Sequence, residues 1–189
     1  KALDDTSKED FGILHVDAHH DLREAYEGFT YSHASIFYNV LNECKNVSKL
    51  IQVGIRDYSK EEAQRMINLG DKGDCLYDTA MQAQIATGKS LEEVFTPYIE
   101  QLPKNVYISI DIDGLEPLNC PNTGTPVPGG LRYGELEHLI FMVVKSGRKI
   151  IGFDLVEVGD SKNGWDANVG SRVLYNLCGA LLASQGKIE

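Results

Sequence analysis

Short apolar runs alternate with amphipathic stretches along the chain, and this alternation predicts strands separated by helices. Runs rich in Val, Ile and aromatic residues, of the length of buried strands, occupy residues 13–16, 50–55, 75–77, 106–110 and 149–156. Ser-x-x-Glu capping boxes at Ser59 and Ser90 begin helices that end near Gly70 and Leu102. Further helices are predicted from Ser32 onward, over 132–145 and over 168–182.

This order of elements predicts an α/β fold. Strands separated by helices form βαβ units, so we expect a mainly parallel sheet with helices on both faces. In such sheets, ligands bind beyond the carboxyl ends of the strands. Asp17, Asp111 and Glu157 each follow a predicted strand. Function is therefore expected at that edge of the sheet.

Metal-ligand side chains recur at every second position after two of these strands. Asp17, His19 and Asp21 follow the first strand, and Asp111 and Asp113 follow the fourth. Residues two apart in an extended segment point to the same side. Either group alone is equally typical of Asp residues that cap turns and helices. Two such groups together favour a metal site, because clustered carboxylates repel one another unless cations neutralise them.

Composition limits the class of protein. The chain has 189 residues, of which 42% are hydrophobic, and a formal net charge of −10. It has the size of one globular domain, and no apolar run approaches the roughly 20 residues of a membrane span. The acidic charge and the lack of a Lys and Arg cluster argue against nucleic acid and anionic membrane as partners. A small cationic molecule is compatible with this charge.

Several other reactive side chains are assigned structural roles. His15 lies inside the first strand and is expected to be a core imidazole with a backbone partner, and His20 has the wrong parity to join its neighbours. His138 is expected to be an ordinary helix residue. The four cysteines are scattered without a C-x-x-C pair, which fits reduced thiols in a cytoplasmic protein, and we assign them no catalytic role.

Three ordered motifs carry a family resemblance. They are DAHHD at residues 17–21, SIDIDGLEP at 109–117 with GTPVPGG at 124–130, and FDLVEV at 153–158. In order and approximate spacing they resemble the ureohydrolase signatures of arginases and agmatinases, over nearly the whole chain. The resemblance implies a three-layer αβα fold of the arginase type. It also implies two manganese ions per subunit and hydrolysis of a guanidinium group to urea and an amine.

By position, the resemblance assigns roles to individual residues. Asp17 and Asp111 would bridge both ions, Asp21 would bind the first, and His19 and Asp113 would bind the second; an oxygen-rich ligand set of this kind suits manganese better than zinc. The candidate catalytic residues are Asp21, His33 and Glu157. His33 would transfer a proton to the departing amine, and Glu157 would pair with the substrate guanidinium.

The chain departs from the family pattern at two points. The family's first ion is also held by a histidine upstream of the first motif, and nothing before Asp17 resembles that stretch. His15 is too close to Asp17 to replace it. We therefore expect residues 1–189 to form a single ureohydrolase catalytic domain that lacks its N-terminal strand or strands. The second departure is Glu116, where the family usually has Asp, and this change could shift a supporting hydrogen bond.

Substrate identity is open within the family. The stretch SHASIFY at residues 32–38 is closer to agmatinases than to arginases, so an agmatinase-like enzyme is favoured. Arginase and formimidoylglutamase activities remain alternatives, with α-groups read by loops such as 56–58 and 163–166. A truncated or inactive relative that serves as a binding subunit is the other alternative. The family resemblance also implies a homo-oligomer.

Overall fold

The computed structural model describes residues 1–160 and 162–188, and within them it contains one five-stranded parallel sheet. The strands are β1 (Phe11–Val16), β2 (Val47–Val53), β3 (Gly73–Leu76), β4 (Asn105–Asp111) and β5 (Lys149–Val156). The helices are α1 (Ala2–Thr6), α2 (Ile36–Glu43), α3 (Lys60–Asn68), α4 (Asp78–Ala86), α5 (Leu91–Ile99), α6 (Tyr133–Lys145) and α7 (Trp165–Ser184). Short 3₁₀ turns are η1 (His33–Ser35), η2 (Gly70–Lys72) and η3 (Ile112–Gly114).

The strand order is β3-β2-β1-β4-β5, so β1 is central and β5 forms one edge. The chain runs outward from β1 to β3 and then returns to the other side of β1 as β4. Val16 at the end of β1 pairs in register with Ile110 of β4. The point where the direction of winding reverses therefore lies between β1 and β4, and the chain segments that follow these two strands emerge side by side.

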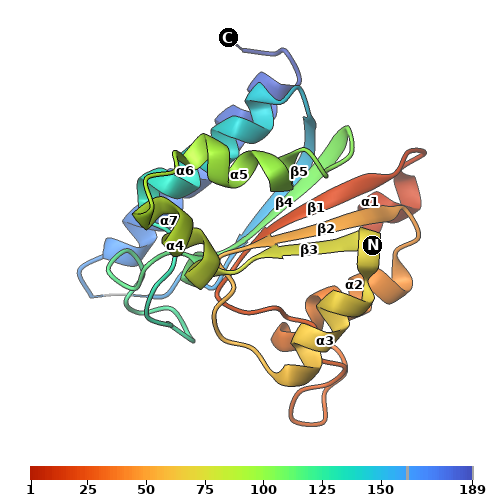
Figure 1. The fold of residues 1–189 in the computed structure, drawn as a ribbon, viewed down its shortest axis with the longest axis horizontal. Coiled ribbons are helices and arrows are strands. Elements are labelled where there is room, and N and C mark those ends of the chain that lie inside the picture. Colours follow the sequence, from red (N-terminus) through yellow and green to blue (C-terminus); the bar gives the residue numbers. More distant parts are fainter. Residues whose placement is uncertain (161, 189) are drawn as a thin grey trace.

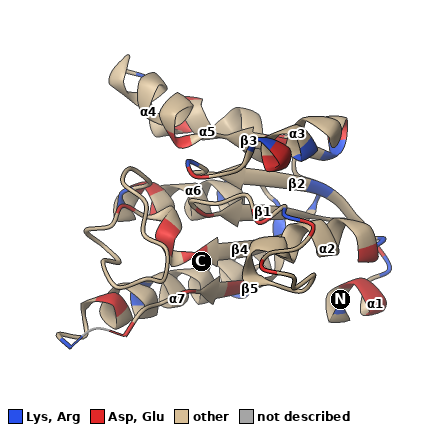
Figure 2. Ribbon diagram, turned by 90° about the horizontal axis from the view of Figure 1, so that it is seen from below, with Lys and Arg blue, Asp and Glu red and all other residues tan. Residues whose placement is uncertain are grey.

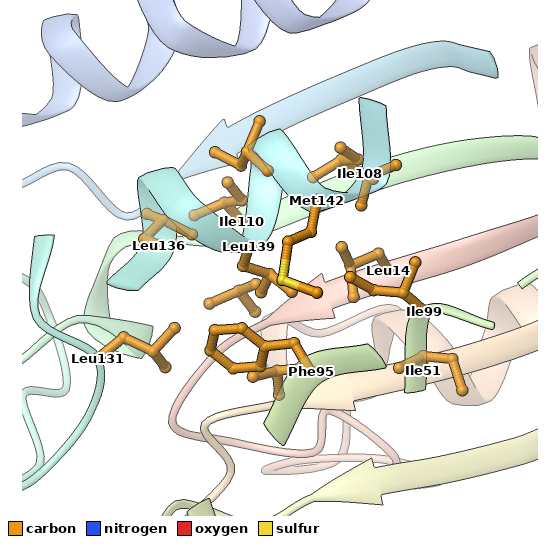
Figure 3. Packing of buried hydrophobic residues seen from close by; sticks show 14 of the residues in the cluster. Leu14, Ile51, Phe95, Ile99, Ile108, Ile110, Leu131, Leu136, Leu139 and Met142 are labelled. Carbon is orange, nitrogen blue, oxygen red and sulfur yellow. The ribbon is translucent and has the colours of Figure 1, made fainter. Parts of the chain in front are cut away.

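Helices cover both faces of the sheet, as the sequence predicts (Figure 1). On one face, Phe95 of α5 and Leu139 of α6 point toward the sheet (Figure 3). They pack with Leu14, Ile51 and Ile108, and all five side chains are almost fully buried. Truncating a large side chain in such a core to Ala typically costs about 3–5 kcal/mol. This core holds the strands that carry the candidate metal ligands.

A second core lies on the opposite face, under α2 and α3. It brings Phe37 of α2 and Met66 of α3 together with Phe11, Ile13 and Leu50 of the sheet. The predicted capping box of α3 is confirmed, because Ser59 Oγ accepts a bond from Glu62 N at 3.2 Å and Glu62 Oε2 accepts one from Ser59 N at 2.9 Å. Two layers of helices therefore enclose one sheet, which confirms the predicted three-layer architecture.

The structure adds two helices and shifts several element boundaries relative to the sequence prediction. Helices α1 and α4 have no counterpart in the predicted order, and α7 begins at Trp165 rather than at Asn168. Within the described residues, no helix combines the length and apolar character that a membrane span needs. Figure 2 shows Lys and Arg spread over several elements, among more numerous Asp and Glu.

Candidate metal centre

A cavity of about 390 Å³ opens at the carboxyl ends of the central strands. This is the reversal point between β1 and β4, where open α/β sheets place their ligands. The predicted site residues that line it are Asp17, His19, Asp21, His33, Asp111 and Glu157. Asp113 lies directly behind this lining and is almost fully buried. The structure therefore gathers all the predicted site residues at one place.

Asp17, His19 and Asp113 form a group that could hold a metal ion. His19 Nδ1 lies 3.3 Å from Asp17 Oδ1 and 3.2 Å from Asp113 Oδ2. Backbone groups orient both carboxylates, since His19 N donates to Asp17 Oδ1 at 2.7 Å and Ala18 N donates to Asp113 Oδ1 at 3.1 Å. The loop after β1 thus supports ligands from both strands.

A second such group consists of His15, Asp17 and Asp21. His15 is buried as predicted, but the prediction of a backbone partner is wrong. Its Nε2 lies 2.9 Å from Asp17 Oδ2, and its Nδ1 lies 2.9 Å from Gln52 Nε2. The period-two pattern could not reveal these partners, because Gln52 comes from a different strand. Asp17 is common to both groups, so it lies between two possible ion positions.

Asp111 lines the same cavity but belongs to neither group among the described residues. Its Oδ1 accepts a bond from Asp113 N at 2.9 Å. Burial, followed by the charges of Asp17 and Asp113, raises the pKa of Asp111 to about 9. Burial and the charge of Asp17 likewise raise the pKa of Asp21 to about 8. Both carboxyl groups therefore stay protonated at neutral pH until a cation is present.

The first group has the opposite electrostatic character. Burial would raise the pKa of Asp17, but hydrogen bonds from His15 and His19 outweigh it and hold that pKa below its ordinary range. Burial lowers the pKa of His19, but hydrogen bonds to Asp113 and Asp17 outweigh it and raise that pKa to about 10. Four carboxylates and one imidazole in this arrangement fit hard divalent cations that favour oxygen ligands.

His33 and Glu157 lie on the cavity wall away from these groups. His33 begins η1 and packs edge-on against Tyr26, with ring centroids 5.4 Å apart. Glu157 follows β5, and its backbone carbonyl accepts a bond from Thr123 Oγ1 at 2.9 Å. Asp21 and Glu157 have positive φ angles of 54° and 58°, a conformation that few residues other than Gly adopt. Strain of this kind gathers at functional sites.

Sequence reasoning missed part of the cavity wall. Thr125 Oγ1 donates to Asp113 Oδ2 at 3.1 Å, and its place in the GTPVPGG motif was the available signal. Glu62 also lines the cavity, where its Oε1 accepts a bond from Leu22 N at 3.2 Å. The sequence pattern explained Glu62 as part of a capping box, so it gave no sign that this residue also lines the cavity. The cavity is also lined by Arg23, Tyr26 and Asp57. None of the three stands in a distinctive sequence motif.

Some residues considered as substrate contacts have other partners. The Arg56 guanidinium donates to backbone carbonyls that include Asp113 O at 2.7 Å and Val127 O at 2.9 Å. Asp166 is fully buried and accepts bonds from Asn122. Neither lines the cavity, whereas Asp57 does. Glu116 contacts Asn119 and borders a different depression. Of the two loops at 56–58 and 163–166, the first therefore reaches the cavity through Asp57.

Comparisons with known proteins agree with this geometry. Residues 1–179 match the sequence profile of the arginase family. N(1)-aminopropylagmatine ureohydrolase of Thermus thermophilus is 35% identical over 170 residues, which cover 90% of this chain and 54% of that protein. An agmatinase of Halalkalibacterium halodurans is 37% identical over 155 residues, with coverage of 79% and 47%.

The fold comparison leads to the same group of proteins. The crystal structure of agmatine ureohydrolase from Thermoplasma volcanium superposes with a TM-score of 0.77 at 25% sequence identity, covering 98% of this chain and 60% of that one. The chain thus spans about half the length of the relatives it matches.

Proposed function

The chain belongs to the arginase family, and from this premise we propose that it carries the catalytic site of a ureohydrolase. The reaction is hydrolysis of a guanidinium group to urea and an amine. The observation that carries the proposal is the cluster of Asp17, His19, Asp21, Asp111 and Asp113 at the reversal point of the sheet. Glu157 and His33 line the same cavity, which supports the roles proposed for them in substrate contact and proton transfer.

The ligand set fits two Mn²⁺ ions per subunit. Asp17, His19 and Asp113 would hold one ion and Asp17 and Asp21 would contribute to the other, while Asp111, which lines the same cavity, would contact both. Two divalent ions bound there would lower the pKa of a shared water and supply the hydroxide that attacks the guanidinium carbon.

The other residues of the cavity act on the substrate directly. The Glu157 carboxylate would bind the guanidinium through charge-assisted hydrogen bonds and so orient its carbon toward the ligand groups. His33, which lines the same cavity, would donate a proton to the departing amine nitrogen. Asp21, with its raised pKa, would carry its full charge when cations occupy the site.

The cavity favours a dicationic substrate of the agmatine type. Asp57 adds negative charge to the wall beyond the ligand groups. A substrate with a carboxylate, such as arginine or formimidoylglutamate, would need a cationic partner there. Arg23 lines the cavity and could be such a partner by its charge. Its Nε, however, lies 3.5 Å from Glu62 Oε2 and is already paired with that carboxylate. Arginase, formimidoylglutamase and a purely binding role are therefore the secondary alternatives.

The active unit extends beyond the sheet described above. β5 has β4 as its neighbour and lies at an edge, with most of its residues only half-buried. A partly apolar groove of about 330 Å³ beside it exposes parts of Phe11, Tyr107 and Asp154. A further strand of the same catalytic domain, paired to β5, would cover both features. A cytoplasmic location and assembly into a homo-oligomer belong to the same proposal.

The test measures Michaelis kinetics of the parent and of Glu157→Gln with agmatine, arginine and formimidoylglutamate. Both are used as full-length proteins reconstituted with Mn²⁺. Glu157→Gln keeps the side-chain volume but removes the charge, so kcat/KM for the preferred substrate should fall at least about 100-fold. Metal content should not change. Glu61→Gln, on an exposed turn of α3, is the matched control and should behave like the parent. Full activity of Glu157→Gln would contradict the proposal.

A further inference from the structure

A continuous chain of buried hydrogen bonds leads from Asp17 across the sheet. Asp17 Oδ2 lies 2.9 Å from His15 Nε2, and His15 Nδ1 lies 2.9 Å from Gln52 Nε2. Gln52 Oε1 lies 2.6 Å from His20 Nδ1, and His20 Nε2 lies 3.3 Å from the Tyr77 hydroxyl. The path runs from β1 through β2 to the residue that follows β3. Sequence patterns gave His15 and His20 no common role.

One backbone carbonyl determines the direction of every bond in this chain. Gln52 Nε2 lies 2.8 Å from the carbonyl oxygen of His20, which can only accept. The amide nitrogen must therefore face that carbonyl, and the same nitrogen donates to His15 Nδ1. The amide oxygen then faces His20 Nδ1. Gln52 is fully buried, so the reversed amide would leave its oxygen against the carbonyl oxygen of His20, a repulsive contact away from water.

The two imidazoles consequently adopt opposite tautomers. His15 accepts at Nδ1, so its hydrogen is on Nε2 and points at Asp17 Oδ2. His20 donates from Nδ1 to Gln52, so its Nε2 accepts from Tyr77. The ring of Phe37 packs against His15 with centroids 4.1 Å apart and limits rotation of the imidazole. His15 is thereby a fixed donor to a carboxylate.

We propose that Gln52 is a positioning residue for the metal centre: by fixing the tautomer of His15 it orients the Asp17 carboxylate, and it makes His15 a support of that ligand rather than a ligand. This rests on the proposed function only in treating Asp17 as a metal ligand. Because Nε2 of His15 carries its hydrogen, that atom has no lone pair for a cation. Hydrogen bonds to a ligating carboxylate typically matter about 10- to 100-fold in metal affinity.

The tautomers can be measured without metal. Long-range ¹H–¹⁵N correlation spectra of the metal-free chain, labelled with ¹⁵N-histidine, distinguish a protonated ring nitrogen from an unprotonated one. We expect the Nε2–H form for His15 and the Nδ1–H form for His20. Gln52→Glu offers His15 an acceptor in place of a donor, so Nδ1 should gain a hydrogen while Nε2 keeps the one that faces Asp17, and the spectra should show the doubly protonated imidazolium. A His15 that carries its hydrogen on Nδ1 in the parent overturns the proposal, and no variant is needed for that result.

Metal affinity tests the positioning role. In Mn²⁺ titrations by calorimetry, Gln52→Met should bind about 10- to 100-fold more weakly than the parent. Gln64→Met, which changes an exposed glutamine of α3, is the matched control and should bind like the parent. If the parent binds Mn²⁺ and Gln52→Met binds equally well, the positioning role is wrong and the proposed function stands. A parent that binds no Mn²⁺ overturns the metal centre and the positioning role together, even if both tautomers are as stated.

Discussion

Asp17 and Asp111 occupy equivalent places at the ends of two neighbouring strands, but their surroundings give them opposite electrostatic properties. Asp17 receives hydrogen bonds from His15 and from His19 N, and its pKa lies below its ordinary range. Asp111 accepts a bond from Asp113 N, while burial and neighbouring carboxylates raise its pKa to about 9. Position in the fold therefore places a carboxylate at the site, whereas nearby donors decide whether it is charged without metal.

This difference suggests a division of labour within the metal centre. In the β1 half, Asp17 is preorganised as an anion by side chains behind it, whereas Asp111 in the β4 half depends on the incoming cation for its charge. A first ion would bind where the negative charge already exists, and its own charge would then favour ionisation of Asp111 and Asp21.

The largest expected effect comes from removing either shared carboxylate. Asp17→Asn and Asp111→Asn should each abolish binding of both Mn²⁺ ions, because Asp17 belongs to both ligand groups and Asp111 is proposed to contact both ions. Asp113→Asn should retain one ion, since Asp113 belongs to only one group. Metal analysis after dialysis measures the stoichiometry. An Asp111→Asn protein that holds two ions would contradict the comparison.

A smaller effect is expected on the pH dependence of the metal-free protein. The folded-state pKa values of Asp21 and Asp111, about 8 and about 9, exceed the ordinary value of 3.8. Such groups contribute stability that is complete below pH 3.8 and is lost as the pH rises through the folded pKa. His19, with a folded pKa of about 10, adds a loss between about pH 6.5 and 10. The free energy of unfolding should therefore fall between pH 5 and 9, by at least the roughly 1.4 kcal/mol of one pKa unit.

Substitutions of Asp111 and Asp17 should change the free energy of unfolding in opposite directions. In urea unfolding with a chelator at pH 9, Asp111→Asn should stabilise the protein, because it removes a carboxyl group that the fold disfavours as an anion. Asp17→Asn should destabilise it, because the low pKa of Asp17 means that the fold favours its anion. Changes of the same sign in the two variants would show that the two strand ends are electrostatically alike.

The smallest effect is expected at Thr125, which supports the β4 half alone. Thr125→Val removes the bond from Oγ1 to Asp113 Oδ2, although Ala18 N still donates to the other oxygen. The loss should be about 1 kcal/mol, or roughly fivefold in Mn²⁺ affinity. The control is Thr30→Val, at an exposed position outside the cavity. A loss as large as that of Gln52→Met would mean that both halves are supported equally from behind.

Elements with a strong local pattern were predictable from sequence. β5 spans Lys149–Val156, as its continuous apolar run predicts, and both Ser-x-x-Glu capping boxes are present. Helix α4 was missed because its apolar residues do not mark one face, and Asp78 and Met81 are its buried residues. The added helix α1 has five residues, which is too short for a helical period to show.

The sequence was enough to select the candidate ligands but not the side chains that support them. Alternation at two strand ends is a local property, so Asp17, His19, Asp21, Asp111 and Asp113 could be selected as candidates that the fold brings together. The partners of His15 and the raised pKa of Asp111 depend on residues brought together by the sheet. Gln52 lies 37 residues from His15 in the sequence, and no local pattern connects them.

The left-handed backbone at Glu157 has a consequence for attempts to engineer this protein. At a φ of 58°, a residue with a Cβ is disfavoured by roughly 1 kcal/mol relative to Gly. A selection for thermal stability alone should therefore enrich Gly at position 157. The same change deletes the carboxylate proposed to face the substrate guanidinium. A screen that scores folding without turnover would thus select proteins of higher thermal stability that lack this carboxylate. Position 157 is best held fixed in such libraries.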